Sequence, residues 1–370
     1  MKRILINALP MTVVGTGIGR YLRGLANACE RECRDTVALS YFVGDRIVEL
    51  PPVVQGAGWQ ERMGQLLWKL PTPIAYGARL LRHFRTEKHF CELCEGFDVY
   101  HEAGYFPYIP QERIRTILTV HDLSLLRFPQ WHPPERVRYA NRYFRERLPL
   151  VDGFCAVSAF TKQEMVEHLG VAPEMITVTP LGVDPEQFNE TPDPIAIQAL
   201  DAFGLPDEFM LFVGSGDPRK NRELLVAALG AARTALPLVT VGWSGWSDDD
   251  LSGCVNMGYV SDATLAQLYR SAKMLVMPSE YEGFGLPVVE AMACGCPVLT
   301  SDAGALREVG GDAVEVVADI HDAKAFGACL DALFAEPEQL RGMSERGLAL
   351  AARYTWTRTS LQTVATWQRG

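Results

Sequence analysis

Short apolar segments alternate with amphipathic, helix-like segments along almost the whole chain of 370 residues. Helical patterns separate the apolar segments, for example at residues 18–31, 134–148 and 160–168. This alternation is typical of parallel β-sheets whose strands are joined by crossover helices. It predicts an α/β fold, with strands in the first half at residues 3–7, 36–43, 98–102, 116–121, 153–158 and 176–180.

The series of strands starts again in the second half of the chain. A proline-rich, acidic segment at residues 184–194 precedes it and has the composition of an exposed connection. We therefore expect two doubly wound, Rossmann-like domains, residues 1–187 and 188–354. The second has predicted strands at residues 209–214, 238–242, 255–259, 274–277, 297–301 and 313–317.

The end of the chain carries a helical pattern of its own. Trp356, Leu361, Val364 and Trp367 are spaced to form one apolar stripe on a helix. We expect this helix, residues 355–370, to pack back on the first domain.

The chain lacks the apolar segments of membrane-spanning and secreted proteins. No run approaches the roughly 20 apolar residues that a helix needs to span a bilayer. Residues 1–7 lead directly into a strand, without the apolar region and cleavage site of a signal peptide. The nine cysteines are scattered and odd in number, which argues against a disulfide framework. We expect a cytoplasmic protein with reduced thiols and no nucleic-acid partner.

One basic segment stands out in a chain whose net charge is −10. Between Arg62 and Lys88, basic residues are interleaved with leucines, and Glu87 is the single acidic residue. Such a segment could lie on an anionic membrane surface or hold a lipid-linked acceptor. A solvated pair of helices covering one domain face is the favoured explanation of the pattern. The basic residues are Arg62, Lys69, Arg79, Arg82, Arg85 and Lys88.

The most informative motif is a pair of glutamates, Glu282 and Glu290, with seven residues between them. Pro287 suits the first turn of a helix, which places Glu282 in a loop and Glu290 inside the helix. We expect the amides of Leu286 and Val288 to be free at the helix start and to face an anion. A diphosphate fits there, with carboxylates on either side to accept sugar hydroxyls.

Two cations follow the first strand of the second half. Arg219 and Lys220 are placed at a helix start just beyond the carboxyl end of the strand at 209–214. Cations at that position oppose the helix dipole unless an anion is bound. Because ligands of open α/β sheets bind at the carboxyl ends of strands, a phosphate-binding role is the simplest explanation.

The first half carries two further candidate features at strand ends. A glycine-rich segment at residues 15–19 follows the first strand and opens a helix. We expect the amides of this segment, including those of Gly17 and Gly19, to face a phosphate or substrate. The spacing departs from the dinucleotide fingerprint because Arg20 follows Gly19. His121 ends another strand, so it is expected at the same sheet edge.

Seven motifs in this order resemble the retaining glycosyltransferases of family 4, which have the GT-B fold. The resemblance implies an acceptor-binding first domain and a nucleotide-sugar-binding second domain that face a central cleft. The run at 121–133 is similar to that of bacterial mannosyltransferases of polysaccharide and O-antigen assembly. The matching segments are residues 17–21, 119–124, 156–158, 180–184, 214 with 218–221, 258–262 and 282–290.

The resemblance also implies a role for each candidate residue of the second domain. Glu290 would bind the ribose, Arg219 and Lys220 would neutralise the diphosphate, and Val260 would border the base. Donor-sugar hydroxyls would be held by Glu282 together with the backbone of Gly283, Phe284, Gly285 and Leu286. One departure concerns the position after Gly214, where many members have arginine and this chain has Ser215.

In the first domain the resemblance implies that Gly17 and Gly19 close on the diphosphate and that His121 touches the transferred sugar. We expect Arg219 and Lys220 to replace a divalent ion, with no other cofactor. Glu282 and Glu290 are not expected to act as a hydrolase dyad.

The function implied is transfer of a sugar, with GDP-mannose as the leading donor, to a glycan or lipid-linked acceptor in cell-surface polysaccharide or lipopolysaccharide synthesis. Retention would need no protein nucleophile, because the departing phosphate oxygen would take the acceptor proton. Two alternatives stay open: a catalytically silent nucleotide-sugar-binding scaffold, and a nucleotide-sugar epimerase.

Overall fold

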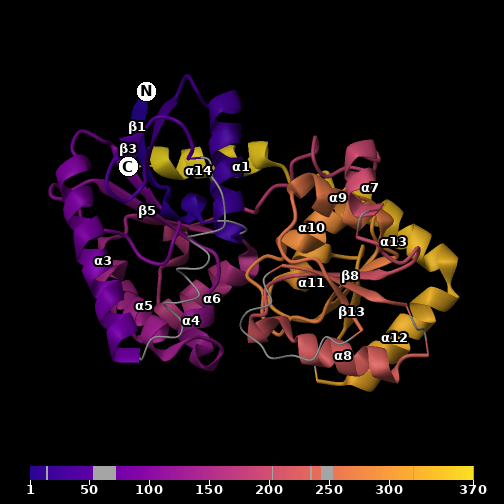
Figure 1. Cartoon of the computed structure of the whole chain (residues 1–370). Helices are drawn as coiled ribbons and strands as arrows, with labels where there is room; N and C mark the ends of the chain where they lie inside the picture. The colour runs from indigo at the N-terminus through magenta and orange to yellow at the C-terminus, as the bar shows by residue number, and fades with distance from the viewer. Residues whose placement is uncertain are drawn as a thin grey trace. The chain divides into compact units, whose positions relative to one another are not determined.

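The computed structural model of the chain forms two compact units (Figure 1). The first unit comprises Met1–Gly182 and Trp356–Gly370, and the second comprises Val183–Thr355. The expected boundary after residue 187 falls inside the second unit. The structure describes residues 1–13, 16–52, 72–201, 203–233, 236–242, 253–319 and 321–369.

The first unit is built on a seven-stranded sheet with the order β3-β2-β1-β4-β5-β6-β7. All neighbours pair in parallel except β3, which pairs antiparallel with β2 and was not expected. The β3 segment is only two residues long and gives little sequence signal. The strands are β1 (Lys2–Asn7), β2 (Val37–Phe42), β3 (Ile47–Val48), β4 (Val99–Glu102), β5 (Arg115–Val120), β6 (Gly153–Ala156) and β7 (Ile176–Val178).

Local sequence explains where the helices of the first unit begin and end. Thr16 caps one helix by accepting from Gly19 N, and Ser158 caps another by accepting from Thr161 N. Gly170 ends the latter in the left-handed conformation that glycine favours. The helices are α1 (Gly17–Glu32), α3 (Thr72–Leu93), α4 (Ser124–Arg127), α5 (Pro134–Arg147), α6 (Ala159–Leu169) and α14 (Trp356–Gln368).

The C-terminal helix α14 belongs to the first unit and packs on α1. Gly24 of α1 makes room for the indole of Trp356, since a Cβ there would collide with the ring. Near the chain ends, Lys2 Nζ donates to Trp367 O at 3.2 Å.

The apolar stripe expected on α14 is wrong at one position. Trp356, Val364 and Trp367 are buried, but Leu361 is 53% exposed. Leu361 lies five residues after Trp356, which turns it roughly 140° away from the buried face of the helix. Hydroxyl residues fill that face instead. Thr363 Oγ1, for example, donates to Thr359 O at 2.8 Å, which satisfies the buried hydroxyl.

The second unit has a six-stranded, fully parallel sheet with the order β10-β9-β8-β11-β12-β13. Its strands are β8 (Met210–Val213), β9 (Leu238–Val241), β10 (Val255–Asn256), β11 (Met274–Met277), β12 (Val298–Ser301) and β13 (Glu315–Val317). Phe212, Val276 and Phe326 lie in its hydrophobic core. The two sheets, parallel except at β3, confirm the predicted α/β fold.

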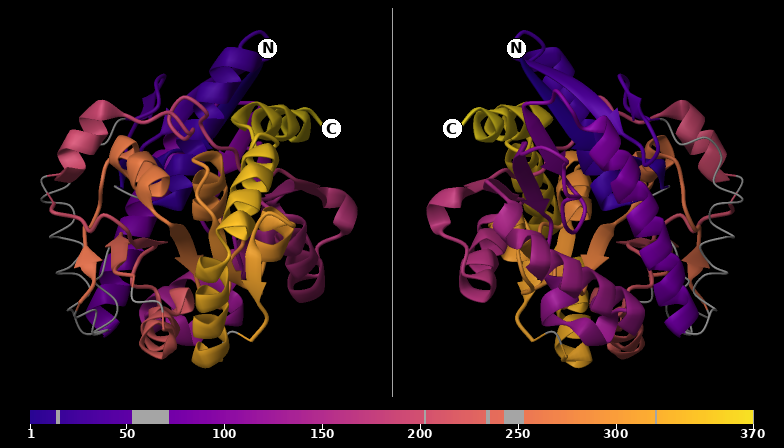
Figure 2. Two further views of the ribbon diagram at one scale, coloured as in Figure 1. Left: turned by 90° about the vertical axis from the view of Figure 1, so that its right-hand side faces the viewer. Right: turned by 90° about the vertical axis from the view of Figure 1, so that its left-hand side faces the viewer.

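Helices of the second unit pack on each other in pairs, with α12 on α8 and α13 on α10 (Figure 2). The helices are α7 (Pro194–Asp201), α8 (Arg222–Ala231), α9 (Asp262–Ser271), α10 (Leu286–Ala293), α11 (Leu306–Gly310), α12 (Ala323–Ala335) and α13 (Pro337–Ala351).

Most of the segment at 184–194 is exposed, as its composition predicts, but its middle is held in place. Phe188 is 5% exposed and lies 6.3 Å from the ring of Tyr269. Arg270 of α9 donates to Asn189 O at 2.6 Å and to Gln187 O at 3.1 Å. One buried ring and one arginine therefore anchor the middle of this segment to the second unit.

All nine cysteines are free thiols. In the described part of the chain, no helix is both long and apolar enough to cross a membrane.

Candidate active site

The candidate site of the second unit begins where β8 ends. A single turn of 3₁₀-helix, Pro218–Lys220, follows this strand, and Asp217 caps it by accepting from Arg219 N at 3.1 Å. The same carboxylate contacts Arg219 Nε at 3.2 Å. The predicted cations do lie beyond the carboxyl end of a strand, and Asp217, which no sequence argument singled out, holds Arg219.

Lys220 and Glu282 form an ion pair, and both side chains are buried. Ser279 Oγ donates to the same carboxylate oxygen, Glu282 Oε1, at 2.9 Å. Burial alone would raise the pKa of Glu282, but Lys220 and Arg219 outweigh it and hold the pKa below its usual value. The glutamate is therefore ionised near neutral pH, and it compensates the buried ammonium.

Backbone contacts bring three loops together around Glu282. Arg219 O accepts from Glu280 N at 2.7 Å, and Glu282 O accepts from Ala305 N at 2.9 Å. Gly304 has a φ of +60°, and a Cβ at that position would collide with the Glu282 carbonyl. The loops after β8, β11 and β12 are thus joined, and Gly304 permits their close approach. The sequence motif at 282–290 gave no signal for this partner loop.

The start of α10 carries the second glutamate. Gly285 precedes the helix in the left-handed conformation, with a φ of +95°, and Glu290 lies inside the helix as expected. Glu290 is 1% exposed, and its Oε2 accepts from Tyr269 OH at 3.1 Å. The expectation of a free amide at Val288 is wrong, because Val288 N donates to Gly285 O at 2.9 Å. The tight turn that Gly285 makes consumes this donor.

Most other predicted residues of the second unit lie in these loops, whereas Val260 follows β10 at the edge of the sheet. Phe284 is buried against the Tyr354 ring, with centroids 5.7 Å apart. Gly214 N donates to Val241 O at 2.9 Å. Two further candidates, Ser215 and Val260, are half-buried. The last two lie on either side of Gly285, with Gly283 in the loop and Leu286 in the first turn of α10.

In the first unit, His121 directly follows β5. Its imidazole hydrogen-bonds the Ala103 carbonyl, and its Nε2 is buried with no hydrogen-bond partner among the described residues. The bond to Ala103 therefore uses Nδ1–H and leaves Nε2 as a bare acceptor. Burial lowers the pKa of His121 to about 4, so the ring is neutral at pH 7.

The glycines before α1 differ from their expectation. Gly15 lies outside the described residues. Gly19 N donates to Thr16 Oγ1 at 3.1 Å, so this amide is used by the helix cap and is not available to a phosphate. Gly17, the first residue of α1, is exposed, and a Cβ there would meet no atom within 4 Å.

A buried polar network lies behind His121. The Tyr21 ring meets His121 edge-on at 5.0 Å, and Tyr21 OH lies 3.0 Å from Thr119 Oγ1. Thr119 Oγ1 is 3.1 Å from His101 Nε2, while His101 Nδ1 accepts from Trp367 Nε1 at 2.9 Å. His101 therefore carries its proton on Nε2. The network joins the last helix to the surroundings of His121, and no sequence motif indicated it.

Among the described residues, no group of three or more histidine, cysteine, aspartate or glutamate side chains is placed to hold a metal ion. In the second unit, fixed cations and carboxylates can recognise an anion and hydroxyls. In the first unit, the neutral imidazole of His121 can accept a hydrogen bond.

Comparison with known proteins decides the family. The model of "Glycosyltransferase Family 4" matches residues 15–187, and that of "Glycosyl transferases group 1" matches residues 201–349. The chain is 31% identical to the O-antigen chain mannosyltransferase B of Escherichia coli, over 98% of both chains. The chain belongs to the glycosyltransferases.

Solved structures show the same fold for this glycosyltransferase. Sucrose-phosphate synthase from Thermosynechococcus elongatus matches with a TM-score of 0.70 at 20% identity, over 100% of this chain and 98% of that one. WaaG, a glycosyltransferase involved in lipopolysaccharide biosynthesis, matches with a TM-score of 0.69 at 14% identity, over 100% of both chains. The resemblance and the GT-B fold inferred from the sequence motifs are confirmed.

Proposed function

We propose that this glycosyltransferase transfers mannose from GDP-mannose to a glycan or lipid-linked acceptor in the synthesis of a cell-surface polysaccharide, with retention of the anomeric configuration. The observation that carries the proposal is the buried Lys220–Glu282 pair beside Arg219, at the carboxyl edge of the second sheet. The likeness to O-antigen chain mannosyltransferase B over 98% of both chains supports the choice of sugar and pathway.

The second unit supplies the charges that the reaction needs. Cleavage of a nucleotide sugar develops negative charge on the leaving diphosphate and positive charge on the sugar. Lys220 and Arg219 stabilise the diphosphate, and their carboxylate partners hold them in place before the donor binds. Because these cations are positioned in advance, little reorganisation is needed when the bond breaks. In this proposal Arg219 and Lys220 act without a divalent ion or other cofactor. Ser215, at a position where many family members have arginine, adds no positive charge.

The hydroxyl groups of the donor are held by acceptors. Glu290 binds the ribose, and Glu282 with the backbone of Gly283 to Leu286 binds the sugar. The bare Nε2 of His121 accepts a hydroxyl of the transferred sugar. The departing phosphate oxygen takes the acceptor proton on the same face, which retains the configuration without a protein nucleophile.

The donor can be tested by binding and turnover. We expect GDP to raise the melting temperature more than UDP or ADP does at equal concentration. Lys220→Ala should abolish consumption of GDP-mannose, whereas Lys273→Ala should not. Lys273 is a suitable control because its Nζ pairs with Glu208 at 2.8 Å and it immediately precedes β11, at the opposite end of the strand from the loop that carries Glu282.

The same experiment separates the alternatives. Nucleotide-sugar binding without turnover, under every acceptor tried, would favour a scaffold. Interconversion of the nucleotide sugar without an acceptor would favour an epimerase. An α-linked product formed from the α-linked donor, detected by the anomeric proton signal, supports retention, and a β-linked product contradicts it.

We also propose that the enzyme is cytoplasmic and binds an anionic membrane surface through α3. Its exposed face combines Arg82 and Arg85 with Leu81 and Phe84, which are 67% and 57% exposed. Arg62 and Lys69 of the predicted basic segment lie outside the described residues. Replacing Arg82 and Arg85 with glutamine should weaken binding to phosphatidylglycerol vesicles and leave binding to phosphatidylcholine unchanged. Equal vesicle binding by variant and wild type would contradict this proposal.

A further inference from the structure

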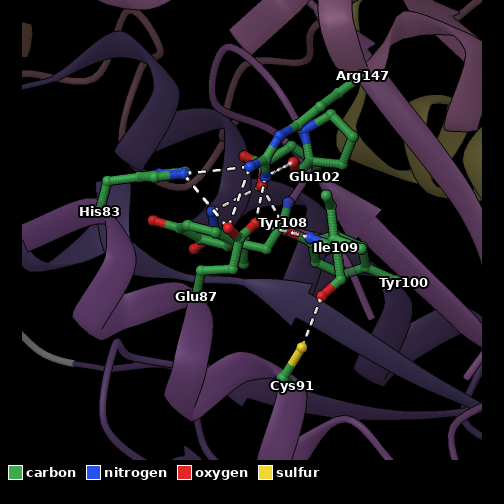
Figure 3. Close-up of polar contacts among 10 residues, drawn as sticks. His83, Glu87, Cys91, Tyr100, Glu102, Tyr108, Ile109 and Arg147 are labelled. Carbon is green, nitrogen blue, oxygen red and sulfur yellow. Dashed lines mark hydrogen bonds and ion pairs between the residues drawn. The ribbon is translucent and has the colours of Figure 1, made fainter. Parts of the chain in front are cut away.

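Glu102 is a buried carboxylate for which the proposed function has no role. It ends β4, one strand away from His121 at the same sheet edge, and is 1% exposed. Its partners are all hydrogen-bond donors. Asn7 Nδ2 donates to Oε2 at 2.7 Å, and Gly104 N donates to Oε1 at 2.5 Å. Tyr100 OH donates to Oε2 at 2.5 Å (Figure 3). The Ala103 amide also donates to the carboxylate.

These bonds fix the turn that follows β4. The carboxylate of Glu102 bends back onto the amides of Ala103 and Gly104, the next two residues of its own chain. A Cβ at Gly104 would lie 2.7 Å from Glu102 Oε1, so a side chain there would displace the carboxylate. The orientation of the Ala103–Gly104 peptide therefore depends on the Glu102 side chain.

The same turn provides the partner of His121. The Ala103 carbonyl accepts the hydrogen bond from the imidazole, which puts the proton on Nδ1 and leaves Nε2 buried, with no hydrogen-bond partner in the described part of the chain. An imidazole in the other tautomer would present N–H at this position and could not accept a hydroxyl proton. The tautomer is thus set by a carbonyl whose own position is set by Glu102.

The loop beyond Gly104 is held from its far side as well (Figure 3). Tyr108 N donates to Tyr100 OH at 3.4 Å, and Ile109 N donates to Glu87 Oε1 at 3.0 Å. Arg147 pairs with Glu87 and donates to Pro107 O at 2.8 Å. Because both flanks of the loop are anchored, the turn at Ala103 and Gly104 has little freedom to move when its bonds to the Glu102 carboxylate change.

We propose that Glu102 is a positioning residue for His121: its carboxylate holds the Ala103–Gly104 turn so that the Ala103 carbonyl keeps His121 Nε2 as an acceptor for a sugar hydroxyl. This proposal rests on the proposed function only for the identity of the ligand. The tautomer of His121 can be measured whether or not the donor is correctly named.

The first test replaces Glu102 with glutamine. The amide group of glutamine must place its NH₂ against a donor now bound to the carboxylate, so the turn loses at least one hydrogen bond. In ¹⁵N-histidine spectra at a pH well above 7, where Glu102 is ionised, we expect the wild type to show His121 protonated on Nδ1 alone, with the signal assigned by its loss in His121→Gln. In Glu102→Gln this signature should give way to a mixture of tautomers. Loss of one such bond should lower kcat about tenfold, with the donor KM nearly unchanged.

A second variant keeps the charge of Glu102. Gly104→Ala should push the carboxylate away from the turn and produce the same change in tautomer and kcat. Gly77→Ala on α3 is its control, because a Cβ there meets no atom within 4 Å. Glu164→Gln, which removes a buried carboxylate paired with Arg127 in the same unit, is the control for loss of a buried charge.

The pH dependence provides a third readout. Burial raises the pKa of Glu102 to about 7, and the bonds from Tyr100, Asn7 and the two amides oppose that rise only in part. The titratable groups facing it, Tyr100 and Tyr108, have pKa values raised by burial and stay neutral. Protonation of Glu102 removes an acceptor from the turn, so kcat should fall as pH drops through about 7, and this step should be absent in Glu102→Gln.

Each outcome decides the proposal. A changed His121 tautomer in both Glu102→Gln and Gly104→Ala, with kcat lowered beyond the effect of Glu164→Gln, supports it. An unchanged tautomer in a folded Glu102→Gln overturns it, whatever happens to kcat. If no nucleotide sugar is consumed by the wild type, the proposed function fails while the tautomer measurement still decides the role of Glu102.

Discussion

Lys220 and Glu282 form a buried ion pair that connects the turn after β8 to the loop after β11. A pair of this kind contributes little net stability, because both charges lose their hydration. Its removal from one side only is costly, since the remaining charge stays buried without compensation. Single and double substitutions of this pair can therefore distinguish a loss of stability from a loss of catalysis.

Replacement of Lys220 by methionine should leave Glu282 buried without its cation. We expect a loss of about 3 kcal/mol in the free energy of unfolding, together with loss of sugar transfer. The double variant with Glu282→Gln should recover most of the stability and none of the activity. Denaturant unfolding and donor consumption measure the two effects. A double variant as unstable as Lys220→Met would show that the pair does not act as a unit.

Stability should depend on pH through Glu87 of the first unit. Burial tends to raise the pKa of Glu87, but hydrogen bonds from His83, Arg147 and the Ile109 amide outweigh it and lower the pKa to about 2 (Figure 3). A depressed pKa stabilises the folded state above the unfolded value near 4.5. This stabilisation is lost as pH falls from about 4.5 to 2.

Glu87→Gln should accordingly destabilise the protein by roughly 2 kcal/mol at pH 7 and have little effect near pH 2. Thermal unfolding of the variant and the wild type across this pH range measures the difference. Glu92→Gln is the matched control, because Glu92 lies on the same helix, is 55% exposed and pairs with Lys88 at 3.9 Å. A constant difference between Glu87→Gln and wild type at all pH values would refute the assignment.

Much of this architecture could be predicted from the sequence, because strands and amphipathic helices are local patterns of apolar residues. All twelve expected strands occur. As expected, the structure also places four site residues at strand ends or helix starts: Arg219, Lys220, Glu282 and Glu290. The added antiparallel β3 has too few residues to show a pattern.

The wrong predictions concern backbone amides that could donate either to a ligand or to a neighbouring residue. The amides of Gly19 and Val288 were expected to face a ligand, but the first is bound by Thr16 and the second by Gly285. Glu102 has no motif of its own, since its partner Asn7 is distant in sequence and three other donors come from neighbouring residues. Such contacts depend on strand order, which local patterns do not specify.

Gly304 should be intolerant of any side chain. Alanine there pays the cost of a left-handed backbone, roughly 1 kcal/mol, and its Cβ would also collide with the Glu282 carbonyl. We expect Gly304→Ala to lower the melting temperature and to reduce sugar transfer by displacing Glu282. Gly204→Ala isolates the backbone cost, because Gly204 has a φ of +61° and a Cβ there meets no atom within 4 Å. Equal behaviour of the two variants would contradict the proposed clash.

The C-terminal helix should be sensitive at Trp367 and tolerant at Leu361. Trp367 is fully buried and donates to His101 Nδ1 at 2.9 Å. Burial lowers the pKa of His101 to about 3, so the ring stays neutral and its Nδ1 needs a donor. Trp367→Phe removes that donor and leaves a small cavity, and we expect a loss of about 2 to 3 kcal/mol in stability.

Leu361→Ala, on the same helix, should change stability by less than about 0.5 kcal/mol, because the side chain is 53% exposed. Unfolding midpoints of the two variants distinguish a helix held by its buried tryptophan from one held by a general apolar stripe. If Leu361→Ala were as destabilising as Trp367→Phe, the exposed position of Leu361 would be wrong. If only Trp367→Phe destabilises, the hydrogen bond and the buried indole together hold the end of the chain against the first sheet.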